Sequence, residues 1–227
     1  MSNAVLIICQ SGTGKSTAIR TLPPAETFVL NVVDKPLPFR GSRNAYTKLS
    51  PDGKTGNYYS SDQHQTLLKV INLVNTQRLD IKYLVIDDFG YSISNDFMRK
   101  SQIKGYDKYT ELGKNAFEIF DKLISLREDL FVFVMMHTEV DKLAGISKPK
   151  TVGQMIDQYV CIEGRFTYVL HSYVSDGQYG FVTNNDNFHM AKSPMDLFEL
   201  KIPNDLLFVV ERINEYLNED VTNDQSL

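Results

Sequence analysis

A glycine-rich turn near the N-terminus constrains this chain more than any other feature of its sequence. Residues 12–17 read Gly-Thr-Gly-Lys-Ser-Thr and follow the continuous apolar run 5–9. Such a run is typical of a strand buried on both faces. A short helix is expected over residues 16–22, ended by Pro23 and Pro24. A strand, a glycine-rich turn and a helix N-terminus in succession predict a phosphate-binding loop.

The residue types in this turn suit phosphate and Mg²⁺. Gly12 and Gly14 allow backbone N–H groups to turn inward without a Cβ in the way. Lys15, expected at a solvent-open ligand site, can bring its charge to the β- and γ-phosphates, and the Ser16 hydroxyl is a suitable Mg²⁺ ligand. The alternative is a glycine-rich turn that only caps a helix. The residues expected to contact ATP are Gly12, Thr13, Gly14, Lys15, Ser16 and Thr17.

The turn departs from the full phosphate-loop pattern at one position. In G-x-x-x-x-G-K-[ST] the first glycine falls at position 9, where this chain has cysteine. A side chain at Cys9 could narrow the first turn of the loop, but the backbone N–H of this residue is not the main phosphate donor.

A second apolar run ends in two acidic residues. Residues 83–86 read Tyr-Leu-Val-Ile and precede Asp87 and Asp88. In a phosphate-loop protein an acid at the end of such a strand holds Mg²⁺, so Ser16 and Asp87 are the expected metal ligands. Two interpretations of Asp88 remain open: a second carboxylate or base beside the metal, or a cap for the segment that follows.

Hydrolysis of a nucleotide also requires a group that orients the attacking water. Asp34, after the apolar run 27–33, is one candidate, and Asp88 and Glu139 are the others. His137 follows the apolar run 130–136 and is expected to sense the γ-phosphate; the alternative is an ordinary histidine at a strand end. The expected catalytic residues are therefore Lys15, Asp34, Asp87, Asp88 and His137, whereas His64, His171 and His189 are expected to be structural or exposed.

Apolar runs alternate with helical patterns, and this order indicates the fold class. Strands separated by helices predict a mostly parallel sheet with right-handed crossovers, an α/β fold in three layers. Without repeats or a linker, residues 1–227 are interpreted as one domain. Strands are expected at 5–9, 27–33, 83–86 and 130–136, with an antiparallel C-terminal flank at 159–162, 166–174 and 180–183. Helices are expected at 62–78, at 112–124, with Phe117 in its apolar stripe, and at 206–217, with Asn204 as its cap. Residues 36–61 are expected to form a long loop with a hairpin around Asp52.

Composition excludes several classes of protein. Two cysteines, Cys9 and Cys161, supply neither a disulfide framework nor a cysteine zinc site, and Cys161 is expected to be buried in its strand. The apolar runs are too short to span a membrane, and the N-terminal residues do not read as a signal peptide, so a cytoplasmic protein is expected. A net charge of -4 disfavours coating of nucleic acid but permits a local basic groove.

Two groups of cations are candidates for such a groove. Cations mixed with aromatic residues suit single-stranded DNA, through phosphate neutralisation and base stacking. A solvated helix face and a mobile loop are the alternatives. The first group is Arg99, Lys100, Lys104 and Lys108, interleaved with Phe97, Tyr106 and Tyr109, and the second is Lys142, Lys148 and Lys150.

Over nearly its whole length the chain resembles the phage ATP-binding proteins of the RecA-like class, small ATPases that accompany single-strand annealing and recombination. The resemblance rests on residues 11–16, 34–39 and 86–89, on His137, and on further matches at 109–113, 150–153, 163–167, 191–198 and 203–205. It departs from the family at Cys9, where glycine is usual.

This resemblance implies a RecA-like phosphate-loop ATPase in the host cytoplasm, with ATP and Mg²⁺ as cofactors. It also implies a homo-oligomer that couples hydrolysis to single-stranded DNA, with a phage annealing or single-strand-binding protein as partner. Lys192 is then a candidate for a cation supplied to a neighbouring subunit, or else an exposed turn lysine. The alternatives are a nucleotide-gated loader or partner protein with little turnover and a small-molecule kinase. Sparse arginines after Asp88 disfavour the kinase.

Overall fold

The strands of the protein form one mixed sheet. The computed structural model describes residues 2–140, 145–152 and 161–224. Within these residues nine strands lie in the order β3-β2-β4-β5-β1-β7-β8-β9, with β6 paired to β5. Their bounds are β1 Asn3–Cys9, β2 Thr27–Asn31, β3 Tyr58–Ser60, β4 Tyr83–Asp87, β5 Phe131–Val140, β6 Ser147–Pro149, β7 Tyr168–Ser175, β8 Gln178–Val182 and β9 Lys201–Pro203.

The predicted α/β fold, with a mostly parallel sheet and antiparallel C-terminal strands, is confirmed. From β3 to β7 every neighbouring pair along the sheet is parallel, whereas β7–β8 and β8–β9 are antiparallel. The antiparallel part therefore begins one strand later than predicted, because β7 pairs with β1 in parallel. The predicted strand at 159–162 lies partly outside the described residues, and Cys161 and Ile162 are not in a strand.

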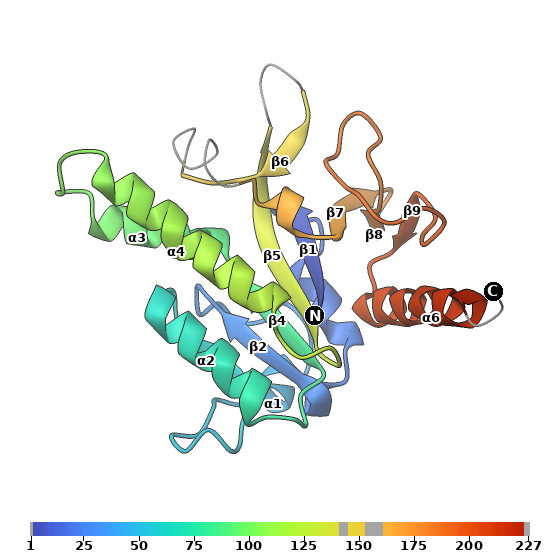
Figure 1. The fold of residues 1–227 in the computed structure, drawn as a ribbon, viewed down its shortest axis with the longest axis horizontal. Coiled ribbons are helices and arrows are strands. Elements are labelled where there is room, and N and C mark those ends of the chain that lie inside the picture. The colour runs from blue at the N-terminus through green and yellow to red at the C-terminus, as the bar shows by residue number, and fades with distance from the viewer. Residues whose placement is uncertain (1, 141–144, 153–160, 225–227) are drawn as a thin grey trace.

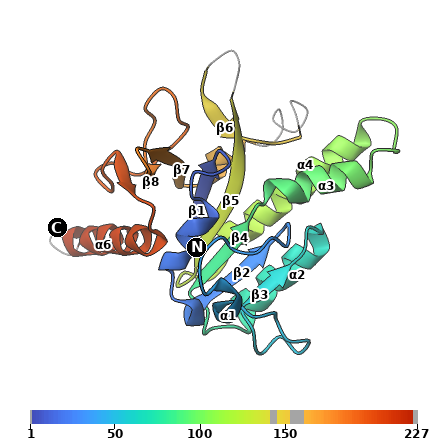
Figure 2. The ribbon, with the colours of Figure 1, turned by 180° about the vertical axis from the view of Figure 1, so that it is seen from behind.

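Helices cover both faces of the sheet (Figures 1 and 2). Alternate side chains of the buried strands enter two separate cores, as in a sheet packed on both sides. Leu6 and Ile8 of β1 pack in the core under α2, α3 and α4, while Val5 and Ile7 pack in the core with η1 and α6. The helices are η1 Ser16–Thr21, η2 Pro24–Glu26, α1 Ser42–Ala45, α2 His64–Thr76, α3 Gly90–Arg99, α4 Asp107–Ile124, η3 Glu163–Arg165 and α6 Leu206–Asp224.

Two details of the predicted helices are wrong. Phe117, assigned to the apolar stripe of α4, is 44% exposed, while Ile119 is buried in its place. The guanidinium of Arg165 lies 4.0 Å from the centre of the Phe117 ring, so this ring packs against a cation at the surface. At the start of α6, the backbone N–H of Phe208 donates to Asp205 rather than to Asn204, which leaves the Asn204 side chain free for another contact.

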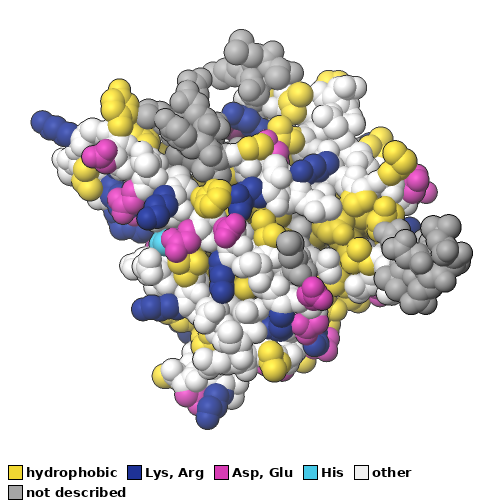
Figure 3. Space-filling model, viewed as in Figure 1, with side chains coloured by type: hydrophobic (Ala, Val, Ile, Leu, Met, Phe, Trp, Pro, Cys, Tyr) yellow, Lys and Arg dark blue, Asp and Glu magenta, His cyan; other side chains and the backbone are white. Residues whose placement is uncertain are grey.

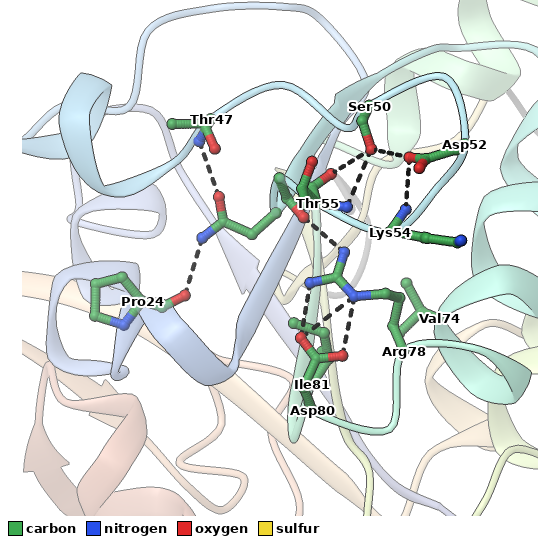
Figure 4. A network of polar contacts seen from close by, with 12 residues as sticks. Pro24, Thr47, Ser50, Asp52, Lys54, Thr55, Val74, Arg78, Asp80 and Ile81 are labelled. Atoms are coloured by element: carbon green, nitrogen blue, oxygen red, sulfur yellow. Dashed lines mark hydrogen bonds and ion pairs between the residues drawn. The ribbon is translucent and has the colours of Figure 1, made fainter.

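The long loop between β2 and α2 is held by polar contacts (Figure 4). Around Asp52 the chain reverses in a turn in which the backbone N–H of Ser50 donates to the Thr55 carbonyl, 2.9 Å. The two arms of this turn are not a pair of strands: among the described residues Lys48 makes only an isolated parallel bridge to Tyr58, and β3 pairs with β2, so the predicted hairpin is reduced to a turn. The buried guanidinium of Arg78 donates to the Gly56 carbonyl at 2.6 Å and to Asp80 at 2.7 Å, and so anchors the loop to the end of α2.

None of the helices in the described ranges combines the length and the apolar character that a membrane crossing requires.

Candidate functional site

The glycine-rich turn joins the carboxyl end of β1 to the first helix, as the sequence predicts. Gly12 and Gly14 have φ values of 86° and 90°, in the left-handed region that favours glycine. A Cβ on Gly14 would lie 2.9 Å from the Tyr179 ring. The helix over Ser16–Thr21 is a 3₁₀ helix and ends just before Pro23, close to the predicted boundary.

The loop lysine is buried against two acidic residues. The Lys15 ammonium donates to Asp87 and, at 2.7 Å, to Asp88, and its side chain is only 6% exposed. The prediction that Lys15 is open to solvent is therefore wrong. Burial by itself would lower the pKa of Lys15, but the charges of Asp87 and Asp88 outweigh it and raise this pKa above its usual value.

The two expected metal ligands lie side by side. The Ser16 hydroxyl donates to Asp87 Oδ1 at 3.0 Å. Mg²⁺ prefers oxygen ligands and is often held by one or two carboxylates together with substrate phosphates, so this hydroxyl–carboxylate pair fits Mg²⁺. Within the described residues no cluster of three or more His, Cys, Asp or Glu could hold a metal. A metal here would therefore take further oxygen ligands from phosphate or water.

Asp88 is not a helix cap. The N-cap of α3 is Phe89, and it makes no side-chain capping hydrogen bond. The Asp88 carboxylate instead lies 2.7 Å from Lys15 Nζ and 3.3 Å from His137 Nε2. Burial favours the protonated acid, yet the hydrogen bond from His137 and the charge of Lys15 hold the pKa of Asp88 well below its usual range. Its φ of 88° is a strained conformation of the kind found at functional sites.

His137 lies level with the end of β1, but it does not end its own strand. Its register partner is Cys9, and β5 continues for three residues beyond it, to Val140. The imidazole stands edge-on to the ring of Tyr91, with centroids 5.9 Å apart. Cys9 is still within β1, so the turn begins after it, and its Sγ lies 4.0 Å from His137 Nδ1. Burial raises the pKa of the Cys9 thiol to about 12.

Most of the predicted site residues line one cavity of about 340 Å³ at the carboxyl ends of β1 and β4. This phosphate-loop cavity also contains residues that the sequence analysis did not single out. Its lining includes Cys9, Gly12, Gly14, Lys15, Ser16, Thr17, Asp87, Asp88 and His137 from the sequence prediction, and Lys35, Tyr91 and Tyr179 in addition.

Three predicted residues lie outside the phosphate-loop cavity. The Thr13 hydroxyl points instead toward Ser172, with 2.6 Å between the two oxygens. Asp34 accepts a hydrogen bond from the Tyr58 hydroxyl at 3.0 Å and lines a different cavity. Its φ of 58° is in the left-handed region, and although Lys35 and Pro36, which follow it, line the phosphate-loop cavity, Asp34 itself does not. Glu139 lines a neighbouring cavity of about 440 Å³ that shares His137 with the first.

Two residues from the C-terminal part contact the loop from the far side of β1. Tyr179 of β8 lies against Gly14, and the Asn204 amide donates to the Gly14 carbonyl at 3.3 Å. Arg20 in turn donates to the Asn204 side chain at 3.0 Å. The sequence could have suggested Tyr91, which follows Asp87 by four residues, in the first turn of α3. It carries no local signal for Tyr179 or Asn204, because both reach the loop only through the strand order of the sheet.

Two of the four cations in the first predicted group are paired with acidic side chains. Arg99 pairs with Asp62 at 2.8 Å, and Lys100 lies 2.9 Å from both Asp96 and Glu111. On the face shown in Figure 3, acidic and basic side chains are interspersed. The paired cations favour the solvated helix face, whereas Lys108 lies over the rings of Phe97 and Tyr109, 5.4 Å from each centroid, as the predicted mixture of cations and aromatic side chains requires.

The remaining predicted cations are scattered. Lys142 lies outside the described residues, Lys148 is 3.7 Å from Glu139, and Lys150 is exposed beside the neighbouring 440 Å³ cavity. Lys192 is exposed and does not line the phosphate-loop cavity; its backbone pairs with Val169. Among Lys148, Lys150 and Lys192, which the structure describes, Lys150 alone lines the cavity that shares His137 with the phosphate-loop cavity.

The histidines expected to be structural or exposed lie away from the phosphate-loop cavity. His171 is buried, and its ring packs on that of His189 with centroids 4.4 Å apart. His189 is paired with Asp186 at 2.8 Å, and His64 with Glu118 at 3.1 Å.

Comparison with known proteins adds no assignment: neither a protein-family model nor a curated protein matches this chain. The functional argument therefore depends on the geometry of the site.

Proposed function

We propose that this protein binds ATP with Mg²⁺ at the phosphate-loop cavity and hydrolyses it, as a RecA-like phosphate-loop ATPase. The observation that carries the proposal is the convergence of Lys15, Ser16 and Asp87 at the carboxyl ends of parallel strands. Ligands bind preferentially at this edge of an α/β sheet. A cation, a hydroxyl and a carboxylate beside a helix N-terminus together suit a phosphate chain and its metal ion.

In this proposal each group has a separate task. Lys15 supplies positive charge to the phosphates, while Ser16 and Asp87 would hold Mg²⁺. Bound Mg²⁺ neutralises charge on the phosphate oxygens. Because Lys15 already contacts both carboxylates, its charge is held at the cavity before a nucleotide binds.

Asp88 is the favoured residue for orienting the attacking water. Its carboxylate lies in the phosphate-loop cavity beside Lys15 and His137, whereas Asp34 lies in another cavity. The lowered pKa of Asp88 keeps it ionised at neutral pH, so it can accept a hydrogen bond from water. His137 Nε2 lies 3.3 Å from the Asp88 carboxylate, and the residue lines the phosphate-loop cavity, where its imidazole would contact a γ-phosphate.

The nucleoside would lie toward Tyr179. In the sheet, β4 and β5 lie on one side of β1, while β7 and β8 lie on the other. Asp87, Asp88 and His137 therefore mark the terminal-phosphate end of the cavity, and the half-exposed Tyr179 ring marks its opposite end. A base can stack on such a ring.

The resemblance to phage recombination ATPases supplies the biological part of the proposal. By that resemblance the protein acts in the host cytoplasm on phage DNA, as a homo-oligomer, with an annealing or single-strand-binding partner. A nucleotide-gated partner protein with little turnover is the second candidate. One observation favours it: the Asp88 carboxylate already contacts Lys15 and lies 3.3 Å from His137, so it is engaged by side chains rather than open to water.

The experiment that tests the proposal is ATP turnover, measured as phosphate release with and without single-stranded DNA over a range of protein concentrations. The ATPase proposal predicts Mg²⁺-dependent turnover that rises with DNA and is lost in Asp87→Asn. ATP binding without turnover under every condition would favour the nucleotide-gated partner. Absence of ATP binding would refute both.

A further inference from the structure

A cavity of about 470 Å³ lies beside the phosphate-loop cavity, next to the carboxyl end of β2. Its floor is apolar and aromatic, with Leu37 and Tyr46 buried and Tyr58 half-buried. Its rim carries the exposed cations Lys35, Arg43 and Lys48. We call this the β2 cavity. It combines an aromatic floor with a cationic rim.

Two of the three rim cations of the β2 cavity are available to a ligand. Among the described residues neither Arg43 nor Lys48 takes part in an ion pair, in contrast to Arg99 and Lys100 of the predicted groove. Asp34 is the one acidic residue in the lining, and its carboxylate accepts the Tyr58 hydroxyl. The rim is therefore locally basic on a chain whose net charge is -4.

The β2 cavity also adjoins the phosphate-loop cavity. Lys35 and Pro36 line both cavities. The Lys35 ammonium lies 3.9 Å from Asp88 Oδ2 and 5.3 Å from the centre of the Tyr91 ring. A ligand that moves Lys35 would change the charge next to Asp88. Binding at the β2 cavity would therefore change the affinity of the phosphate-loop cavity for its ligand.

We propose that the β2 cavity binds single-stranded nucleic acid, with phosphates at Arg43 and Lys48 and a base against Tyr58. This inference rests on the proposed function and gives the DNA-binding part of it a location. Proteins that bind single strands combine a basic groove with aromatic rings that stack on bases. A single strand offers base faces and phosphates together, whereas a duplex hides its base faces and an acidic peptide has none.

The test measures the affinity of a fluorescent oligothymidylate by anisotropy at several salt concentrations. The test variant is Arg43→Ala/Lys48→Ala, since neither residue lines the phosphate-loop cavity. The matched control is Lys54→Ala/Lys69→Ala, which removes the same charge from exposed positions outside the β2 cavity. A third variant, Tyr58→Leu, removes the ring without a change of charge.

The test variant is expected to bind oligothymidylate roughly tenfold more weakly, with the slope of log affinity against log salt shallower by about 1.4, or about 0.7 for each lost phosphate contact. Tyr58→Leu is expected to lose roughly tenfold in affinity with an unchanged salt slope, as for a lost stacking contact. The control is expected to stay close to wild type, and all variants are expected to keep their ATP affinity.

Equal losses in the test and control variants, or wild-type binding by the test variant, would overturn the inference. So would competition by polyglutamate or by duplex DNA as effective as that by unlabelled oligothymidylate. The two proposals fail in different ways. ATP binding with no effect of Arg43 and Lys48 on DNA refutes only the β2 cavity assignment. Localised DNA binding without ATP binding refutes the nucleotide site.

Discussion

The Lys15 ammonium lies 2.7 Å from the carboxylate of Asp88, and each of these side chains is less than a tenth exposed. Lys15 also contacts Asp87, so one cation compensates two buried acids. Removal of one partner from a buried ion pair leaves charge uncompensated and typically costs about 3–5 kcal/mol. In the absence of nucleotide, Lys15→Ala is expected to lower the free energy of unfolding by about this amount in a urea titration.

The double variant Lys15→Ala/Asp88→Asn is expected to recover part of that loss, because it removes one of the two unpaired carboxylates. Lys69→Ala, at an exposed helix position, serves as the control and should be nearly neutral. An unchanged unfolding midpoint in Lys15→Ala would show that the ion pairs contribute nothing to the stability of the fold.

Several residues of the phosphate-loop cavity were predictable from local patterns. Asp87 and His137 directly follow continuous apolar runs, Lys15 follows another through the glycine-rich turn, and the carboxyl ends of parallel strands meet at one edge of a sheet. Local patterns therefore predicted most of the lining of the phosphate-loop cavity. The same logic placed Asp34 in the phosphate-loop cavity incorrectly. Asp34 has a positive φ, accepts a hydrogen bond from Tyr58, and lines the β2 cavity instead.

Contacts between distant parts of the chain could not be predicted. Asn204 bonds to Gly14 across 190 positions of sequence, and its polar character had suggested a helix cap instead. Part of the basic stretch around Arg99 is neutralised by acidic side chains, of which Asp62 is distant in sequence and Asp96 is close. For Asn204 a plausible local interpretation failed because a long-range contact decided the role of the residue.

Tyr179 provides a test of where the nucleoside lies. Tyr179→Ala is expected to weaken ATP binding roughly tenfold, as for a lost base-stacking contact, and to leave the binding of inorganic tripolyphosphate unchanged. Tyr179→Phe keeps the ring and should bind ATP like wild type. Both ligands are measured by calorimetric titration with Mg²⁺. An equal loss for ATP and tripolyphosphate would mean that Tyr179 acts on the loop and not on the base.

The two cysteines should differ in reactivity. Cys161 is exposed, whereas Cys9 is buried and its thiol has a pKa of about 12. The sequence-based expectation that Cys161 is buried is thus wrong. A thiol reagent is expected to modify one cysteine rapidly in the native protein and both after denaturation. Cys161→Ser should abolish the native reaction, and its persistence in this variant would contradict the buried position of Cys9.

His171 should make stability depend on pH. Burial, and then the nearby charge of His189, lower the pKa of His171 from 6.5 to about 4; Asp186, beyond His189, opposes this only weakly. In the unfolded chain His171 binds a proton below about pH 6.5, whereas in the folded protein it does so only near pH 4. The free energy of unfolding therefore falls as the pH falls from about 6.5 to about 4. The loss is roughly 3 kcal/mol, at about 1.4 kcal/mol for each unit of pKa.

Urea titrations of wild type and His171→Phe at pH 7 and near pH 4 measure this effect. The variant is expected to lose less stability than wild type between the two pH values. Parallel losses in both proteins would show that another group is responsible.

The most direct test of the central claim is a calorimetric titration of ATP with and without Mg²⁺ into wild type, Lys15→Ala and Asp87→Asn, each first shown to be folded by circular dichroism. Wild type is expected to bind ATP more tightly with Mg²⁺. Lys15→Ala should lose at least about tenfold in affinity, as expected for a lost charge-assisted hydrogen bond. Asp87→Asn should bind ATP without the gain from Mg²⁺. Wild-type affinity and a full Mg²⁺ effect in both variants would contradict the assignment of the phosphate-loop cavity as the nucleotide site.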